Sequence, residues 1–256
     1  MAKVKKYLTK LNPFNTKSEN YFNKTFNKIE ILGEGSFGKV YHVENKATHR
    51  IYAVKEILFK DLDSKEQSDM VNEIDKLIRV QSEYVVQYVD SWDNNKKNNK
   101  RIIYIQMEMY NYSLSNIIKG KAIAFERQIG HPMGLIEYLV SCELFKQVLE
   151  CVKHLHELNP QIIHRDLKPD NILIAVNGRN GRFVKLCDFG LATVHDKRVN
   201  YRLSHKHTAD VGDMRYHAPE VGLGQIYGHR SDIYSLGLIG GELFDMNVLL
   251  IDLEKY

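Results

Sequence analysis

The sequence contains no apolar run long enough to cross a membrane. A membrane-spanning helix needs about 18 or more consecutive apolar residues, and no stretch approaches that length. The first ten residues carry lysines but no apolar segment, which argues against a secretory signal there. These absences predict a protein of the cytoplasm, with the nucleus as the alternative, and no membrane partner.

Cysteine is also scarce, with three in 256 residues. Cys142 and Cys151 are nine positions apart in a segment with a helical pattern, so they face opposite sides and cannot form a disulfide. Cys187 is isolated, and no cysteine spacing resembles a zinc site. Unpaired cysteines in odd number are typical of a reducing compartment.

The positive charge of the chain lies near its N-terminus. Residues 1–30 contain seven lysines and two glutamates, a net charge of +5, so the remaining residues sum to −1. We expect residues 1–25 to form a basic, solvated arm, with a docking or anionic-surface contact as the alternative. The domain itself is not basic, and no nucleic-acid partner is expected.

Hydrophobic periodicity divides the chain into two parts. Residues 26–110 show five strand patterns, with one helical pattern over residues 64–80. Residues 111–256 are mainly helical, with a loop predicted over residues 120–134. We predict an α+β fold with two lobes, a small five-stranded lobe with one helix and a mainly helical lobe. The predicted strands are residues 26–32, 39–43, 51–57, 85–92 and 102–107, and the later helices are residues 113–119, 135–157 and 231–244.

A glycine-rich loop joins the first two predicted strands, with the sequence Gly33-Glu34-Gly35-Ser36-Phe37-Gly38. Glycines let a backbone approach phosphates closely, and the loop N–H groups can point at phosphate oxygens. In dinucleotide-binding folds this spacing opens a helix, whereas here a strand follows. We interpret the loop as a phosphate-binding loop, and an ordinary glycine-rich hairpin is the alternative.

Lys55 lies inside a predicted strand and therefore needs a partner. Glu73, on the apolar stripe of the helical segment, is the natural one, and Glu66 is a weaker candidate. An ion pair between Lys55 and Glu73 would hold the ammonium on the α- and β-phosphates of a nucleotide. The alternative is an exposed lysine and an exposed glutamate without a common role.

The strongest signal is the run HRDLKPDN, residues 164–171. Asp166 can accept a hydrogen bond from an attacking hydroxyl, and Lys168 can neutralise the oxygens of a transferred phosphoryl group. Asn171 and Asp188, the first residue of a later DFG motif, offer the oxygen ligands that Mg²⁺ prefers. The expected cofactors are therefore ATP and Mg²⁺.

These motifs resemble those of the eukaryotic protein kinases over residues 26 to about 245. The resemblance implies phosphoryl transfer from ATP to a protein substrate, and Lys168 is similar to the serine/threonine class. It also implies that the APE motif at residues 218–220 closes the activation segment and that Asp232 holds the catalytic loop. The ATP-binding residues that it implies are Leu32, Gly33, Gly35, Gly38, Val40, Ala53, Lys55, Met107, Glu108, Tyr110 and Leu173.

Two branches of that family compete. The segments YAVKEI, YVVQYVDSW, YIQMEM and HTADVG look like the kinases of translation initiation factor 2 alpha. The segment GDMRYHAPE, residues 212–220, instead looks like the Wee/Myt group. The first resemblance spans more of the chain and is given more weight.

The sequence departs from the kinase pattern at Asp213, where most serine/threonine kinases have threonine. We expect Asp213 to pair with Lys168 and support an active-like loop, and the rival view is that it ties up Lys168 and slows transfer. Thr208 is the predicted site of an activating phosphorylation, with Ser204 a weaker candidate and Arg165 the residue that would bind the phosphate.

The chain also ends sooner after its last predicted helix than the family pattern, which predicts an incomplete helical lobe. A dimer or another partner could cover the apolar face that this leaves. The alternative function is a kinase-like binding or decoy module with weak or no turnover.

Overall fold

The computed structural model describes residues 15–18, 20–35, 38–58, 80–95, 101–128, 131–188, 193–194, 214–222 and 228–246. The chain divides into two compact units, residues 1–81 with 87–109 and residues 82–86 with 110–256. Within the described ranges, none of the helices combines the length and apolar character that a bilayer crossing requires. The helix predicted over residues 64–80 lies outside the described residues, apart from the buried Val80.

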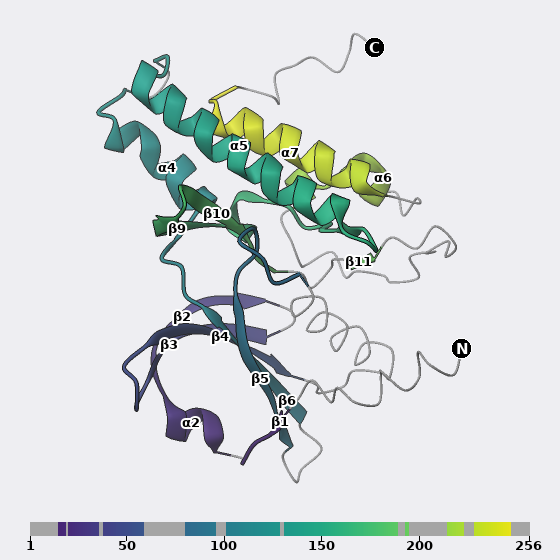
Figure 1. Cartoon of the computed structure of the whole chain (residues 1–256). Coiled ribbons are helices and arrows are strands. Elements are labelled where there is room, and N and C mark those ends of the chain that lie inside the picture. Colours follow the sequence, from purple (N-terminus) through teal and green to yellow (C-terminus); the bar gives the residue numbers. More distant parts are fainter. Residues whose placement is uncertain are drawn as a thin grey trace. The chain divides into compact units, whose positions relative to one another are not determined.

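The first unit is built on a six-stranded sheet with strand order β1-β5-β6-β4-β3-β2 (Figure 1). β1 pairs with β5 in parallel, and the remaining neighbours are antiparallel. The five predicted strands are confirmed, although β5 begins three residues later than predicted. The strands are β1 (Asn15–Thr16), β2 (Phe26–Gly35), β3 (Gly38–Asn45), β4 (Ile51–Leu58), β5 (Tyr88–Asn95) and β6 (Arg101–Glu108).

Residues of the expected N-terminal arm pack on this sheet. The short helix α2 (Tyr21–Thr25) buries Phe22, whose ring stacks on Tyr104 at a centroid distance of 4.9 Å. Lys17 forms an ion pair with Asp90, and its ammonium lies 4.8 Å from the centre of the Trp92 ring. The expectation of a solvated arm is therefore wrong for Lys17, Tyr21 and Phe22, whose side chains pack on the sheet. The buried aromatic cluster consists of Phe22, Phe26, Tyr41, Trp92 and Tyr104.

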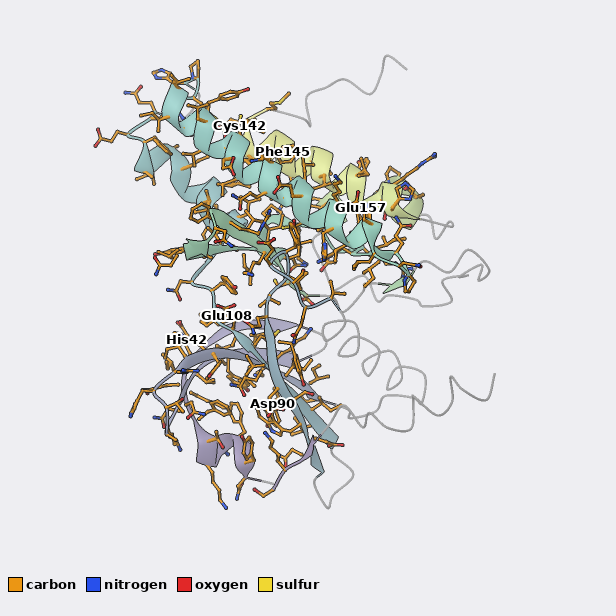
Figure 2. All side chains as sticks on the ribbon, viewed as in Figure 1. His42, Asp90, Glu108, Cys142, Phe145 and Glu157 are labelled. Carbon is orange, nitrogen blue, oxygen red and sulfur yellow. The ribbon has the colours of Figure 1, made fainter. Side chains whose placement is uncertain are left out.

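The second unit is mainly helical, with α5 (Leu135–Glu157) and α7 (His229–Leu243) lying side by side (Figure 1). Phe145, labelled on α5 in Figure 2, meets Phe244 edge to face. The ring centres are 5.8 Å apart. Gly240 permits this approach, because a Cβ atom there would lie 2.9 Å from the Phe145 ring. Together with the sheet of the first unit, these helices confirm the predicted α+β class.

Helix α4 (Leu114–Ala124) extends into the segment predicted as a loop. Lys121 is the reason, since its side chain is 4% exposed and its ammonium donates a 2.6 Å hydrogen bond to the carbonyl of Leu243. Arg127, just beyond the helix, binds the buried carboxylate of Glu137 through two nitrogens, each at 2.8 Å. The predicted loop over residues 120–134 is thus wrong for its first five residues, which tertiary contacts hold in the helix.

Short strands and single turns complete the second unit. β10, β9 and β7 form a three-stranded sheet, and β11 pairs with β8. The three cysteines are unpaired, as predicted, with Cys151 buried. The remaining elements are β7 (Tyr112–Ser113), β8 (Ile162–Ile163), η1 (Pro169–Asn171), β9 (Ile172–Arg179), β10 (Arg182–Leu186), β11 (Thr193–Val194), η2 (Met214–Tyr216) and α6 (Pro219–Gly222).

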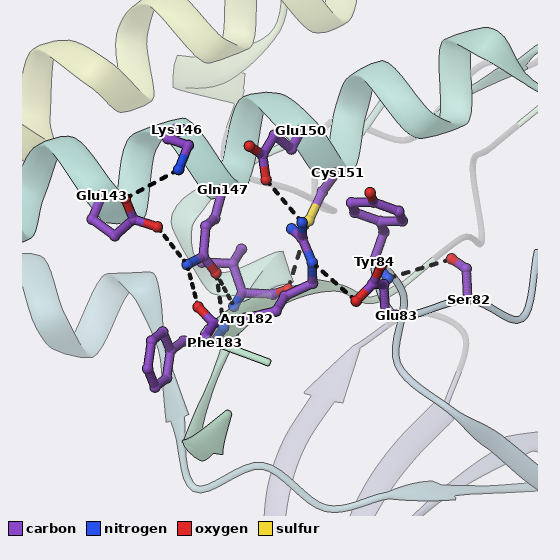
Figure 3. Close-up of polar contacts among 12 residues, drawn as sticks. Ser82, Glu83, Tyr84, Glu143, Lys146, Gln147, Glu150, Cys151, Arg182 and Phe183 are labelled. Carbon is purple, nitrogen blue, oxygen red and sulfur yellow. Dashed lines mark hydrogen bonds and ion pairs between the residues drawn. The ribbon is translucent and has the colours of Figure 1, made fainter. Parts of the chain in front are cut away.

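Residues 82–86 belong to the second unit although residues of the first unit flank them in sequence. The Val86 N–H donates to the carbonyl of Leu186, and the Leu186 N–H donates to the carbonyl of Tyr84, both at 2.9 Å. The guanidinium of Arg182 lies 4.2 Å from the Tyr84 ring centre and binds Glu150 of α5 at 2.9 Å (Figure 3). Backbone pairing and a stacked arginine therefore hold this segment on β10 and α5.

Candidate active site

Asp232, on α7, holds the backbone of the HRD segment. Its side chain is fully buried, and its Oδ2 and Oδ1 accept hydrogen bonds from the N–H groups of His164 and Arg165 at 3.0 and 2.9 Å. Nε2 of His156 lies 2.7 Å from Oδ2. Arg165 has a φ of 72°, a left-handed conformation that costs a non-glycine residue about 1–3 kcal/mol. A buried carboxylate thus fixes a strained turn directly before Asp166.

The structure brings together three of the predicted site residues at Asp166. Its Oδ2 accepts hydrogen bonds from Nζ of Lys168 and from Nδ2 of Asn171, each at 2.9 Å. The same Asn171 nitrogen donates to the backbone carbonyl of Asp166 at 2.8 Å. The carboxylate therefore has a fixed orientation that two side chains of the same loop impose.

The electrostatics around Asp166 favour its ionised form. Burial raises the pKa of this carboxyl, but a polar contact with His217 and the charged hydrogen bond from Lys168 outweigh burial. The pKa falls as a result to about 2, so Asp166 is an anion at neutral pH. An anion in this position can accept a hydrogen bond from an attacking hydroxyl.

Asp188 lies close to Asn171, because the residue before Asp188 is hydrogen-bonded to Asn171. The N–H of Cys187 donates to the carbonyl of Asn171 at 3.0 Å, and the Cys187 carbonyl lies 3.0 Å from Nε2 of His164. Asp188 is exposed and has a φ of 59°, another left-handed conformation. The backbone thus holds the two predicted metal ligands on adjoining segments.

The donor chemistry of Asn171 and Asp188 fits Mg²⁺. The amide nitrogen of Asn171 is directed at Asp166, which leaves its amide oxygen as the atom for a hard cation. In the part of the chain that the structure describes, no cluster of three or more His, Cys, Asp or Glu could hold a metal ion. Mg²⁺ is usually bound through one or two protein groups plus substrate phosphates, which suits so small a donor set.

In the first unit, strand register gathers the expected adenine and phosphate residues on one face. Val40 pairs with Lys55, and Ala53 pairs with Met107. Because directly paired residues and residues two apart share a face, these four side chains lie on the same side of the sheet. Glu108, labelled in Figure 2, ends β6. Its N–H donates to the carbonyl of Gln87 at 3.0 Å.

The glycine-rich segment forms the turn end of the β2–β3 hairpin, in which Gly35 pairs with Gly38. Gly38 has a φ of 131°, and a Cβ atom there would clash with the carbonyl oxygen of Glu56. Gly33 has open space around it, and Leu32 is exposed. Of the expected nucleotide-binding residues, Tyr110 and Leu173 belong to the second unit, where Leu173 pairs with Ser113.

Several predicted residues lie outside the described residues, so their roles stay predictions. This applies to the proposed Lys55 partners and to the proposed regulatory positions other than Arg165. They are Glu66, Glu73, Ser204, Thr208 and Asp213.

Two histidines of the site were missed by sequence reasoning. His156 binds Asp232, and Nε2 of His217 lies 3.6 Å from Oδ1 of Asp166. His156 is one of several polar residues on an amphipathic helix, so its partner cannot be read from spacing. The place of His217 directly before Ala218-Pro219-Glu220 was the available signal.

Comparison with known proteins gives a match to the family model described as "Protein kinase domain" over residues 26–253. A probable serine/threonine-protein kinase of Dictyostelium discoideum is 33% identical over 234 residues, which cover 84% of this chain and 46% of the relative. The MAP kinase kinase MKK1/SSP32 of Saccharomyces cerevisiae is 37% identical over 211 residues, covering 82% of this chain and 37% of the relative.

A third relative is a membrane-associated tyrosine- and threonine-specific cdc2-inhibitory kinase of Drosophila melanogaster. It is 31% identical over 231 residues, covering 89% of this chain and 38% of the relative. The chain thus spans less than half the length of these three curated relatives. They do not confirm the predicted closeness to the kinases of initiation factor 2 alpha.

Proposed function

Because the chain belongs to the protein kinase domain family, we propose that it is an active serine/threonine kinase that transfers the γ-phosphoryl group of ATP to protein hydroxyls. The observation that carries this proposal is the environment of Asp166, an ionised carboxylate held by Lys168 and Asn171. The loop before Asp166 is strained and is held by the fully buried Asp232. Such strain has no evident use in a protein that only binds its partner.

The proposed mechanism follows from what each side chain can do. Asp166 orients the acceptor hydroxyl for in-line attack and receives its proton as the bond to phosphorus forms and the bond to the leaving ADP oxygen breaks. Lys168, 2.9 Å from Asp166, stabilises the negative charge on the transferred group. Mg²⁺ held by Asn171 and Asp188 would supply positive charge at the phosphates.

The nucleotide-binding role of the first unit rests on the shared sheet face of Val40, Ala53, Lys55 and Met107. The apolar members suit an adenine ring, and Lys55 suits the α- and β-phosphates. The glycines at positions 33, 35 and 38 carry no Cβ atoms that would hold the backbone away from phosphate oxygens.

The acceptor class is the finer part of the proposal. Lys168, two residues after Asp166, supports serine and threonine. The GDMRYHAPE segment and the cdc2-inhibitory relative support a Wee-like enzyme, while the strand motifs support an initiation-factor-kinase-like one. Phosphoamino-acid analysis of the product and peptides from both substrate classes would separate these possibilities.

Transfer of labelled γ-phosphate to a generic protein such as casein tests the proposal, with wild type compared with Asp166→Asn. We expect the variant to lose about 10²- to 10⁴-fold in rate while it keeps Mg²⁺-dependent binding of a fluorescent ATP analogue. Asp170→Asn is the matched control, because Asp170 is exposed in the same motif. Wild type that binds nucleotide without transferring phosphate would reject the kinase proposal and support the binding module.

A further inference from the structure

The two carboxylate oxygens of Asp166 have different surroundings. Oδ2 accepts hydrogen bonds from Lys168 and Asn171, whereas Oδ1 faces His217, whose Nε2 is 3.6 Å away. An acceptor hydroxyl must therefore approach Oδ1, because Oδ2 already has two donors. The imidazole of His217 stands beside the oxygen that such a hydroxyl would use.

The His217 side chain is 18% exposed, and its Nε2 is buried without a hydrogen-bond partner among the described residues. The described residues thus offer this nitrogen the contact with Oδ1 of Asp166 in place of a hydrogen bond. At 3.6 Å this contact with Oδ1 is longer than a hydrogen bond but within the range of an ion pair.

Tyr216, the residue before His217, is fixed to α7. The carbonyl of Tyr216 accepts a hydrogen bond from the Ser235 hydroxyl at 2.7 Å, and the Tyr216 hydroxyl donates to Glu242 at 2.7 Å. Ala218 is buried. The same helix holds the catalytic loop through Asp232, so a single rigid element positions both His217 and the backbone before Asp166.

We propose that His217 is a positioning residue for phosphoryl transfer, which holds Oδ1 of Asp166 in the orientation that receives the acceptor hydroxyl. This inference rests on the proposed kinase function. Lys168 and Asn171 fix one end of the carboxylate, and the Nε2–H of His217 limits its rotation at the other. The carboxylate then reaches the transition state without reorganisation.

The experiment compares His217→Ala and His217→Gln with wild type in kcat, in KM for ATP and for the acceptor, and in melting temperature. Glutamine offers an amide N–H of similar reach, and His131→Ala is the control because His131 is exposed. We expect His217→Ala to lower kcat about tenfold with KM for ATP within about twofold, and His217→Gln to recover at least a third of the lost rate.

The inference would be overturned if His217→Ala had the same kcat as wild type. It would also be overturned if His217→Gln had no higher kcat than His217→Ala while the variants kept the melting temperature of wild type. In either case the kinase proposal stands, because wild type still transfers phosphate. Wild type without transfer would instead reject the kinase proposal and this inference together. If His217→Ala does not fold, the glutamine variant decides: its kcat must fall below that of wild type while it melts normally.

Discussion

The buried carboxylate of Asp232 accepts a hydrogen bond from the backbone N–H of Arg165, a residue held at a φ of 72°. Asp232→Ala removes this acceptor and the one for His164, leaving buried donors without partners. We expect the free energy of unfolding to fall by about 3–5 kcal/mol, and Asp232→Asn, which keeps one acceptor, to lose less. Urea denaturation measures both, with exposed Arg230→Ala as the control. Equal midpoints for wild type and Asp232→Ala would contradict the prediction.

The pKa of Asp166 is about 2 in the folded protein, below its ordinary value of 3.8. The free energy of unfolding therefore depends on pH in the acid range. Because the folded-state pKa lies below the unfolded one, ionisation contributes about 2 kcal/mol above pH 5, lost as pH falls from about 4 towards 2. Asp166→Asn lacks this titration. We therefore expect wild type to lose about 1 kcal/mol of unfolding free energy relative to Asp166→Asn when the pH is lowered from 6 to 3.

Urea denaturation at the two pH values measures this shift. A parallel series with Asp170→Asn, an exposed carboxylate of the same loop, controls for general charge effects. A difference between wild type and Asp166→Asn that stays constant with pH would mean that Asp166 has an ordinary pKa in the folded protein.

The glycine-rich segment offers a matched pair of substitutions. Gly38→Ala places a Cβ atom against the carbonyl of Glu56 at a φ of 131°, whereas Gly33→Ala meets nothing within 4 Å. We expect Gly38→Ala to lower the free energy of unfolding by about 1–3 kcal/mol and Gly33→Ala to change it by less than about 0.5 kcal/mol. Thermal and urea unfolding of the two variants check this order, and the reverse order would show that the hairpin end adapts to a side chain.

The packing of α2 on the sheet predicts that the N-terminal segment stabilises the first unit. Phe22 contacts the rings of Phe26, Tyr41 and Tyr104, and Phe22→Ala would leave a cavity among them. We expect a loss of about 3–5 kcal/mol, against less than about 0.5 kcal/mol for the exposed neighbour Asn23→Ala. Urea denaturation followed by tryptophan fluorescence suits the measurement, because Trp92 lies in the same cluster. Variants of equal stability would mean that α2 contributes no packing energy.

Strands β2 to β6 of the first unit and the long helix of the second could be predicted from the sequence, whereas the two-residue β1 was missed. Strong periodicity specifies them, and α5 has the predicted bounds of Leu135–Glu157. The HRD run likewise predicted which residues gather at Asp166. These features depend on local pattern or on residues close in sequence.

The remaining features depend on contacts between distant residues. α2 has five residues and no periodic signal, and its burial needs Trp92 from β5 and Tyr104 from β6. The extension of α4 depends on Lys121 meeting Leu243, more than a hundred positions later. The contact between His217 and Asp166 also joins remote segments, so residue spacing alone could not have predicted it.

The placement of residues 82–86 limits how the protein can be divided for experiments. A cut after Met109 would leave this pentapeptide on the N-terminal fragment, while Leu186, whose N–H and carbonyl bind it, stays on the other fragment. Each fragment would then expose backbone groups that the intact chain satisfies. Fragment complementation is therefore a more suitable design than separate expression, since either piece supplies what the other lacks.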